Sequence, residues 1–291
     1  MKHVEKRVGK YIMKMNATGG GIHKTLRGIG TKKRREPELL YLLEQEIKPG
    51  MIVMDLGANI GYITLLMAEL VGPKGRVYAM EPDPSNYKLL KYNVRINSFN
   101  DRVICYEVAI SNKLGMTKFY AGKNASNLGA LTQHKKSVSK PIIVKCNTLT
   151  TFFQEHDPVN FIKMDIEGAE VQVLDGMYNY IKSNDFPCKI VMELHPMFYK
   201  SGEGGLHFWM KKFLESGFKT KCVISAAVPI PDKFKKWGYN EPSRVIRNKG
   251  FYYNFLDKHM LDACCHINKQ WMPGKKKYSP KIARYVLIER K

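Results

Sequence analysis

Short apolar runs alternate with stretches of helical periodicity along most of the chain, and this alternation restricts the possible folds more than any other feature. The runs are short and continuous, as in strands buried on both faces. They lie at 51–54, 76–80, 103–108, 161–165 and 188–193, with weaker ones at 222–225 and 283–288. Helical patterns lie between them at 37–43, 62–70, 85–97, 167–174 and 206–214. Such alternation predicts an α/β fold, in which helices cover both faces of a mostly parallel sheet.

The length and composition exclude several classes of protein. A chain of 291 residues that is 44% hydrophobic can bury a substantial core, so disorder is excluded as its main state. No window approaches the ~18 uninterrupted apolar residues of a membrane span, and the N-terminus lacks the apolar run of a signal peptide. We therefore expect a cytoplasmic protein without a transmembrane segment. The six cysteines lack C-x-x-C spacing, which argues against a zinc ribbon or a disulfide framework.

The formal net charge of +22 is concentrated at the two ends of the chain. Residues 1–35 contain 11 Lys and Arg against 1 acid, 36–199 contain 17 against 18, and 200–291 contain 20 against 7. Basic ends on a nearly neutral body favour an anionic partner, which could be nucleic acid, a lipid headgroup or a phosphorylated substrate. A solvated cationic surface is an equally good explanation of the charge alone.

The basic head is predicted to form a short amphipathic helix followed by a mobile segment. Five apolar residues recur at helical spacing, with lysines and an arginine on the other face. They are Val4, Val8, Tyr11, Ile12 and Met15. Three glycines at 19–21 would end the helix. Its apolar stripe could contact a membrane or RNA, or pack against the main domain. The sequence thus divides into an N-terminal extension, 1–35, and a main domain, 36–291.

Two segments interrupt the α/β pattern within the main domain. Strand-like pieces at 117–120 and 142–146 predict a hairpin-like excursion with a long, flexible loop at 122–140. At about 226–281 the alternation of strands and helices is no longer visible, and the segment contains many Pro, Trp, Tyr and Lys residues. It is therefore predicted to be a basic, irregular insertion before the last strand.

The first strand leads into a glycine turn, D-x-G-x-x-x-G, at 55–61. In an open parallel sheet, ligands bind beyond the carboxyl ends of the strands. Gly57 would allow a tight turn close to a ligand, and Gly61 would allow close packing of the next helix. The turn lacks both the G-x-G-x-x-G of nicotinamide enzymes and the lysine of a P-loop. These two classes are therefore disfavoured.

Glu81 ends the second strand, where its carboxylate could accept hydrogen bonds from two ribose hydroxyls. A nucleoside cofactor without a pyrophosphate fits this arrangement, and S-adenosylmethionine is the common one. The glycine turn alone would be weak support, because many plain strand-to-helix turns share its pattern.

Further segments resemble the FkbM-type S-adenosylmethionine-dependent methyltransferases over about residues 35–225. The most specific is close to the K-I-D-V-E-G-A-E signature of that family, and an E-x-H pattern follows the fifth strand. The matching segments are Arg35-Glu36-Pro37-Glu38, Lys48-Pro49-Gly50, residues 55–64, Glu81-Pro82, Lys163-Met164-Asp165-Ile166-Glu167-Gly168-Ala169-Glu170 and Glu193-Leu194-His195.

The resemblance implies a class I (Rossmann-like) methyltransferase fold with a seven-stranded sheet whose last strand is antiparallel. It makes 36–291 a methyltransferase domain, and it implies S-adenosylmethionine as cofactor and O-methylation of a hydroxyl on a sugar, glycan or other small molecule. The cofactor-binding residues carried over are Asp55, Gly57, Ala58, Asn59, Gly61, Tyr62, Glu81, Pro82, Ala109 and Asp165.

The candidate catalytic residues are four groups expected at the carboxyl edge of the sheet: Asp165, Glu167, Glu193 and His195. A hydroxyl is a poor nucleophile at neutral pH, so a base within hydrogen-bond reach would help. His195 has the most suitable unperturbed pKa. Alternatively, Asp165 contacts only the cofactor, Glu167 belongs to the first turn of a helix and His195 is structural. Glu170 is interpreted as a solvated helix residue.

The same four groups could instead bind a divalent ion that orients the hydroxyl, but nothing in their spacing requires one, and no metal is predicted. A second cluster is treated as structural, because adjacent cysteines do not readily chelate one tetrahedral ion. It comprises His259, Cys264, Cys265 and His266.

Methylation of RNA is the alternative function, and a non-catalytic binding protein is the third class. The basic ends and the aromatic residues interleaved with lysine at 234–239 and 271–278 favour nucleic acid. A typical ribose methyltransferase, however, needs two lysines near the acceptor, and only Lys163 lies near Asp165. Intact glycines and acidic residues disfavour the binding protein. The predicted partner is therefore a hydroxyl-bearing small molecule or glycan, with an anionic substrate, nucleic acid or peripheral membrane contact left open.

Overall fold

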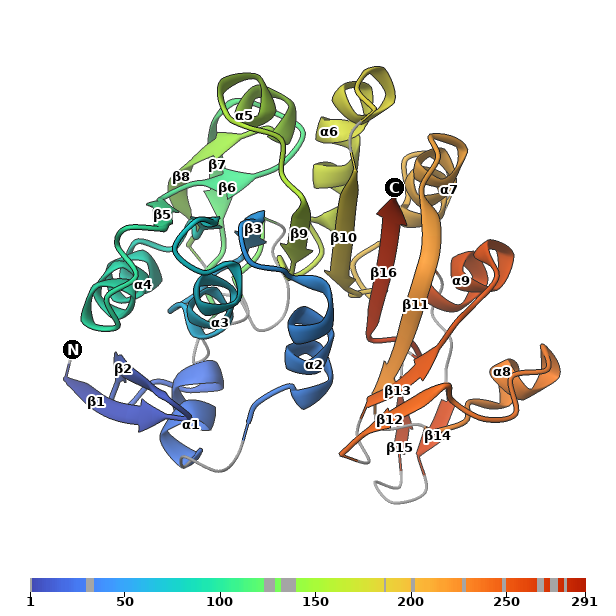
Figure 1. The fold of residues 1–291 in the computed structure, drawn as a ribbon, viewed down its shortest axis with the longest axis horizontal. Helices are drawn as coiled ribbons and strands as arrows, with labels where there is room; N and C mark the ends of the chain where they lie inside the picture. Colours follow the sequence, from blue (N-terminus) through green and yellow to red (C-terminus); the bar gives the residue numbers. More distant parts are fainter. Residues whose placement is uncertain are drawn as a thin grey trace.

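The structure is a computed structural model that is shown as a ribbon in Figure 1. It describes residues 2–29, 34–122, 129–131, 140–185, 187–199, 202–226, 229–247, 250–265, 270–272, 277–279 and 282–291.

The centre of the fold is a nine-stranded sheet with the order β12-β13-β11-β16-β10-β9-β3-β4-β5 in the described part of the chain. The bounds of its strands are β3 Ile52–Leu56, β4 Arg76–Met80, β5 Val103–Tyr106, β9 Phe161–Met164, β10 Cys188–Glu193, β11 Lys219–Ala226, β12 Arg244–Ile246, β13 Gly250–Tyr253 and β16 Tyr285–Arg290.

Five neighbouring strands of this sheet are parallel: β5, β4, β3, β9 and β10. β16 is antiparallel to both β10 and β11. The predicted α/β sheet with an antiparallel last strand is confirmed. The predicted number of strands is too low, because β13 pairs with the outer edge of β11, and β12 with β13. The segment at about 226–281 is therefore not wholly irregular: besides these two strands it contains α8 (Asp232–Lys236) and α9 (Asp257–Cys264), as well as the small hairpin of β14 (Gln270–Met272) and β15 (Lys277–Ser279).

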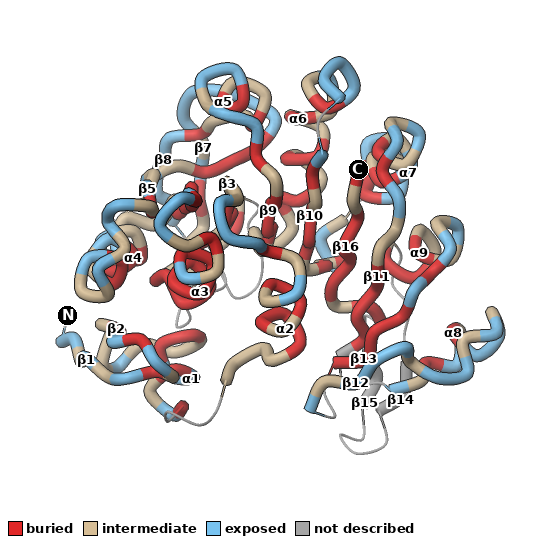
Figure 2. Tube along the Cα trace, in the orientation of Figure 1, coloured by how far each residue is buried: buried red, intermediate tan, exposed pale blue. Residues whose placement is uncertain are grey.

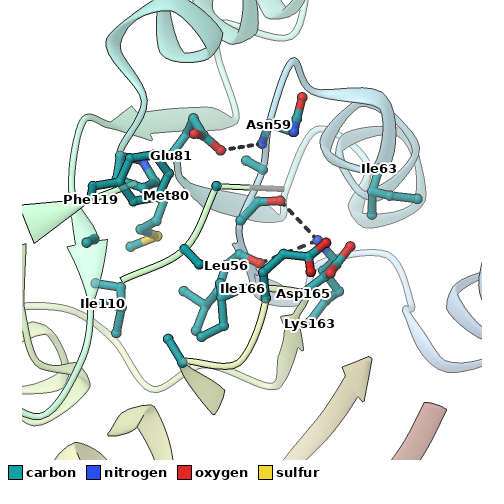
Figure 3. Close-up of a pocket in the computed structure, with 18 of the residues that line it drawn as sticks. Leu56, Asn59, Ile63, Met80, Glu81, Ile110, Phe119, Lys163, Asp165 and Ile166 are labelled. Carbon is teal, nitrogen blue, oxygen red and sulfur yellow. Dashed lines mark hydrogen bonds between the residues drawn. The ribbon is translucent and has the colours of Figure 1, made fainter. Parts of the chain in front are cut away.

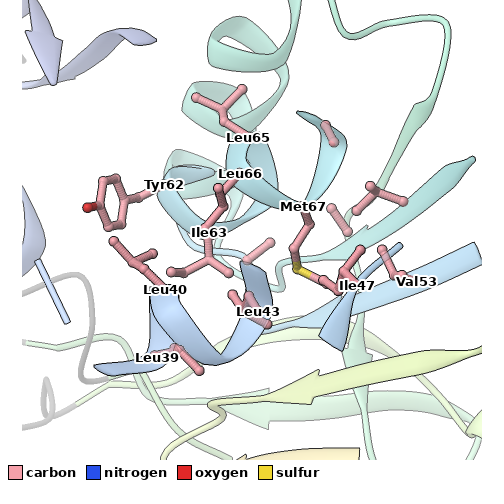
Figure 4. Close-up of a cluster of buried hydrophobic side chains, with 14 of the residues drawn as sticks. Leu39, Leu40, Leu43, Ile47, Val53, Tyr62, Ile63, Leu65, Leu66 and Met67 are labelled. Atoms are coloured by element: carbon pink, nitrogen blue, oxygen red, sulfur yellow. The ribbon is translucent and has the colours of Figure 1, made fainter. Parts of the chain in front are cut away.

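Helices cover both faces of the sheet (Figure 1), as predicted. α2 (Pro37–Glu46), α3 (Tyr62–Val71) and α4 (Pro84–Ile96) belong to one buried apolar cluster. A second cluster includes α5 (Leu149–Glu155), α6 (Glu170–Ser183), α7 (Leu206–Glu215) and α9. On β3, Val53 belongs to the first cluster and Met54 to the second, both fully buried. Burial on both faces explains the continuous apolar runs. Figure 2 shows the buried strands, and Figure 4 shows part of the first cluster.

A three-stranded sheet lies beside the central one, formed by β6 (Ala109–Ile110), β7 (Gly115–Phe119) and β8 (Ile142–Asn147). β7 and β8 are antiparallel, which confirms the predicted hairpin-like pairing. Most of the loop expected to be flexible, at 123–128 and 132–139, lies outside the described residues.

The predicted N-terminal amphipathic helix is wrong. Residues 3–16 form a hairpin of β1 (His3–Val8) and β2 (Tyr11–Asn16), and α1 (Gly21–Gly28) follows where a mobile segment was expected. Gly9, with a φ of 60°, lies in the turn between the two strands. On β2, Tyr11, Met13 and Met15 are buried and alternate with more exposed residues, which is the two-residue period of a strand.

The hairpin is part of the core. Met13 and Met15 are fully buried in the first cluster. Two asparagines, Asn93 of α4 and Asn97 directly after it, bind the backbone of β2. Asn93 Oδ1 accepts a hydrogen bond from Lys14 N at 2.7 Å, and Asn97 Oδ1 accepts one from Ile12 N at 3.0 Å. The apolar side of the head therefore packs on the main domain and is not a free surface for a membrane or RNA. Residues 30–33 lie outside the described chain.

The aromatic side chains near residue 234 also belong to the core. Phe234 is fully buried and packs edge to face against Tyr253 and Phe255, at centroid distances of 4.8 and 4.7 Å. Trp237 stacks on His259 at 4.7 Å. The interpretation of this segment as a platform for stacking bases is therefore wrong. The side chains of the second aromatic segment, 271–278, are outside the part of the structure that is described.

In the described part of the chain, none of the helices is both long and apolar enough to cross a membrane. All six cysteines are free, and Cys146, Cys188, Cys222 and Cys264 are buried.

The position of β2 leads to a test of stability. Met13→Ala should lower the free energy of unfolding by about 2–5 kcal/mol, because it leaves a cavity in the core. Ile12→Ala is the matched control on the same strand, since Ile12 is 38% exposed, and it should cost less than about 1 kcal/mol. Urea denaturation measures both changes. Equal, small losses would mean that the hairpin is a dispensable appendage.

Candidate active site

A cavity with about 890 Å³ of empty space lies at the carboxyl ends of β3, β4 and β9, beside β6 and β7 (Figure 3). Most of the predicted site residues line it, namely Gly57, Ala58, Asn59, Tyr62, Glu81, Pro82, Ala109, Asp165 and Glu167. The wall also includes residues that were not predicted to belong to the site, among them Ile22 of α1, Arg35, Glu36 and Phe119.

Gly57 allows two strand ends to approach each other closely beside the cavity. Its φ is 77°, and a Cβ atom there would lie 2.1 Å from the backbone oxygen of Asp165. Only glycine fits such a position. Gly61, with a φ of 93°, faces Leu90 of α4 rather than the cavity, because a Cβ there would lie 3.0 Å from Leu90 Cδ1.

Asp55 supports the turn from beneath instead of forming the cavity wall, where the sequence analysis placed it. Its carboxylate is fully buried, and it accepts hydrogen bonds from Lys163 Nζ at 2.9 Å and Thr64 Oγ1 at 2.7 Å. Lys163 Nζ also donates to the backbone oxygens of Leu56 and Gly57, at 3.4 and 3.2 Å. Burial alone would lower the pKa of Lys163, but Asp55 and Asp165 raise it, so the lysine is charged.

Glu81 is held rigidly at the end of β4. Its Oε2 accepts a hydrogen bond from Asn59 N at 2.7 Å (Figure 3), and its Oε1 accepts one from Asp83 N at 2.9 Å. Burial raises the pKa of Glu81 to about 7, against the opposing effect of the backbone N–H groups. Each carboxylate oxygen has a further lone pair. Glu81 can therefore accept ribose hydroxyls while it keeps both backbone contacts.

A second polar group lies where β9 and β10 end. His195 Nε2 is 4.0 Å from Asp165 Oδ1 and 3.6 Å from Glu167 Oε2. His195 Nδ1 is hydrogen-bonded to Glu170 Oε1 at 2.9 Å. Glu170 is fully buried and also accepts a hydrogen bond from Tyr199 Oη at 3.3 Å, so its interpretation as a solvated residue is wrong. Asp165, Glu167 and His195 together form a carboxylate–histidine cluster.

Glu167 does not belong to a helix. The predicted helix at 167–174 begins at Glu170, because residues 166–169 form a turn in which Glu167 has a φ of 50° and Gly168 one of 99°. A Cβ atom at Gly168 would lie 2.6 Å from Phe198 Cβ. The turn directs the carboxylate of Glu167 toward His195 Nε2.

The protonation of the carboxylate–histidine cluster differs from the ordinary values. Burial alone would lower the pKa of His195, but Glu170, then Asp165 and Glu167, raise it to about 9. Burial raises the pKa of Asp165 to about 6 and that of Glu167 to about 8. The unliganded imidazole therefore carries a proton at neutral pH, and the assumption of an ordinary pKa that favoured it as a base is wrong.

Glu193 lies near the cluster in sequence but is bound by Arg284 of the segment before β16. Arg284 donates to Glu193 Oε1 at 3.1 Å, Glu38 Oε1 at 2.9 Å and Glu36 Oε1 at 3.0 Å. Glu36 also pairs with Arg35 at 2.8 Å. The structure thus brings together Asp165, Glu167 and His195 and assigns Glu193 to an ion-pair network. The E-x-H pattern in the sequence gave no sign of this partner, which lies 91 residues away.

Comparisons with known proteins identify the family of the chain. A family model described as "Methyltransferase FkbM domain" matches residues 55–220. The chain is 29% identical over 168 residues to the hexuronic acid methyltransferase AglP of Haloferax volcanii, a match that covers 56% of this chain and 63% of that protein. It is 24% identical over 155 residues to methyltransferase sdnD of Sordaria araneosa, covering 43% of this chain and 60% of that protein. The chain therefore spans less than two thirds of each relative.

A solved structure described as methyltransferase FkbM from Methylobacillus flagellatus aligns with a TM-score of 0.35 and 18% identity, over 55% of this chain and 40% of that one. The family model covers more than half of the chain, which confirms the resemblance found in the sequence. The protein therefore belongs to the FkbM methyltransferase family, and S-adenosylmethionine is its cofactor.

Proposed function

We propose that this methyltransferase transfers a methyl group to a hydroxyl oxygen of a sugar, glycan or other small molecule. The observation that carries the proposal is the carboxylate–histidine cluster, two of whose members line the cofactor cavity. Such groups can accept the proton of a hydroxyl as its oxygen is methylated. The similarity to a hexuronic acid methyltransferase supports a saccharide acceptor.

The residues of the cavity fit the cofactor. Gly57 lets the backbone of Asp165 approach the turn, so that both residues line the cavity, and Glu81 offers acceptors for ribose hydroxyls. Val108, Ala109 and Ile110 provide an apolar wall for an adenine ring. When bound, the cofactor supplies an electrophilic methyl carbon on a positively charged sulfur. We assign binding to Gly57, Ala58, Asn59, Tyr62, Glu81, Pro82, Ala109 and Asp165, and turn support to Asp55 and Gly61.

The acceptor is proposed to lie beside Asp165 and Glu167. Both carboxylates line the cavity, and the 10%-exposed side chain of His195 lies behind them, with its orientation fixed by Glu170. Holding the hydroxyl in line with the methyl group can supply much of the acceleration. A carboxylate of the cluster is then the nearest acceptor for the hydroxyl proton, which leaves the protonated imidazole to stabilise its charge.

Methylation of RNA is the second candidate. The charge of +22 favours it, but two observations do not: Lys163 is buried and paired with Asp55, and Phe234 is a core residue. We propose that the basic ends of the chain recruit an anionic substrate. In residues 1–35 only the polar face is available for this, since the apolar face is packed on the main domain; residues 200–291 could contribute as well.

We also propose a cytoplasmic location.

Transfer of radioactive methyl groups tests the function directly. The protein is incubated with methyl-labelled S-adenosylmethionine and with hexuronic acid oligosaccharides, neutral oligosaccharides or RNA. We expect label in a saccharide product that survives mild alkali, because a methyl ether is stable where a methyl ester on a carboxylate is hydrolysed. Label only in nuclease-sensitive material, or only in an alkali-labile ester, would contradict the proposal.

Binding of the cofactor is tested at Glu81. Glu81→Ala removes the acceptors of two ribose hydroxyls and of two backbone N–H groups, each hydrogen bond to a charged group being worth ~1.5–3 kcal/mol. We therefore expect affinity for S-adenosylmethionine to fall at least about tenfold in calorimetry. Glu155→Ala is the matched control, because Glu155 is exposed at the end of α5. Unchanged affinity of the Glu81 variant would remove Glu81 from the cofactor site.

A further inference from the structure

The carboxylate–histidine cluster has the composition and geometry of a metal site. One oxygen of Asp165, one of Glu167 and a nitrogen of His195 all lie within 4.8 Å of one another. The three residues come from the end of β9, the turn after it and the segment after β10. Two carboxylates and an imidazole form a common ligand set for divalent ions such as Mn²⁺, and three protein ligands leave positions open for a substrate oxygen.

The orientation of His195 supports this interpretation independently of the carboxylates. Its Nδ1 is bonded to Glu170, which is fully buried and is also bonded to Tyr199. A histidine that ligates a metal almost always uses its other nitrogen in this way. The remaining nitrogen, Nε2, belongs to a side chain that is only 10% exposed, and at 3.6 and 4.0 Å it lies beyond normal hydrogen-bond distance of both carboxylates.

The balance of charge around the cluster also favours a cation. The carboxylates of Asp165, Glu167 and Glu170 surround one imidazole. Each of the neighbouring cations forms its ion pair with another carboxylate: Lys163 with Asp55, Arg35 with Glu36, and Arg284 with Glu36, Glu38 and Glu193. A dication between the three ligand atoms would compensate the carboxylates.

We propose that Asp165, Glu167 and His195 bind one divalent cation, and that this cation holds the acceptor oxygen beside the cofactor. Cation binding is independent of the proposed function, whereas the role toward the acceptor rests on it. Coordination makes the hydroxyl proton easier to lose. Because the two carboxylates and the neutral imidazole then serve as ligands, the proton passes to water and not to a carboxylate, as it would without the cation. The oxygen forms the bond to the methyl carbon, and the sulfur keeps the electron pair of the broken carbon–sulfur bond.

Binding of Mn²⁺ tests the site without any assay of activity. Electron paramagnetic resonance of free Mn²⁺ is recorded during titration with protein that has been freed of metal by EDTA and dialysed. We expect one Mn²⁺ per chain. Glu167→Gln and His195→Ala should each weaken binding about tenfold or more, because each removes one of three ligands. Glu203→Gln is the matched control, since Glu203 is exposed, and it should bind like the unchanged protein.

Cofactor binding, measured by calorimetry on the same samples, verifies that the variants are folded. Absence of Mn²⁺ binding at millimolar concentration, or equal binding by both cluster variants and the unchanged protein, would overturn the inference. Full methyl transfer in the presence of EDTA would overturn the role toward the acceptor while leaving the proposed function intact. Conversely, Mn²⁺ binding at the cluster without methylation of any saccharide hydroxyl would support the site and contradict a saccharide acceptor.

Discussion

The buried ion pair between Lys163 and Asp55 is the interaction on which the site depends. It joins β9 to β3 at the middle of the sheet, where the two side chains are 4% and 0% exposed. Removing one partner of such a pair leaves an uncompensated charge and typically costs ~3–5 kcal/mol. Lys163 also binds the backbone oxygens of Leu56 and Gly57. The same ammonium group therefore joins the two strands and fixes the first residues of the cofactor turn.

The order of the strands then determines which polar groups meet. β9 and β10 are parallel neighbours, so Asp165, Glu167 and His195 follow strand ends at the same edge. β16 runs in the opposite direction, and it is preceded by Arg284, which binds Glu193. Asp165 and Glu193 were both predicted to be catalytic, but their surroundings differ. Asp165 lines the cavity, whereas Glu193 is neutralised in an ion-pair network.

Much of the sheet could be predicted because its strands are covered on both faces. Such strands are continuous apolar runs, and β4 and β10 begin and end at the predicted residues. The glycine turn could also be predicted, since its conformation restricts the residue at Gly57. The β-hairpin at residues 3–16 could not be predicted, because over so short a segment its apolar residues fit both a helical period and a strand period. Pairing with β1 and packing on α4 decided between them.

The chemistry of the site was predicted less completely than its position. Glu170 raises the pKa of His195 although it lies 25 residues away in the chain, and it is itself hydrogen-bonded to Tyr199. Position in a helix does not reveal such a partner. For Lys163 there was a signal, since a lysine within a buried apolar strand requires a counter-ion. Its partner, Asp55, was instead interpreted as a cofactor contact.

The most direct test of this account is the affinity of Lys163→Met for S-adenosylmethionine, measured by calorimetry at a temperature where circular dichroism shows the variant to be folded. If the buried pair fixes the turn, affinity falls about tenfold or more, a change of ~1.4 kcal/mol, although Met conserves most of the volume of the lysine chain. A folded Lys163→Met protein that binds the cofactor as tightly as the unchanged protein would contradict the account.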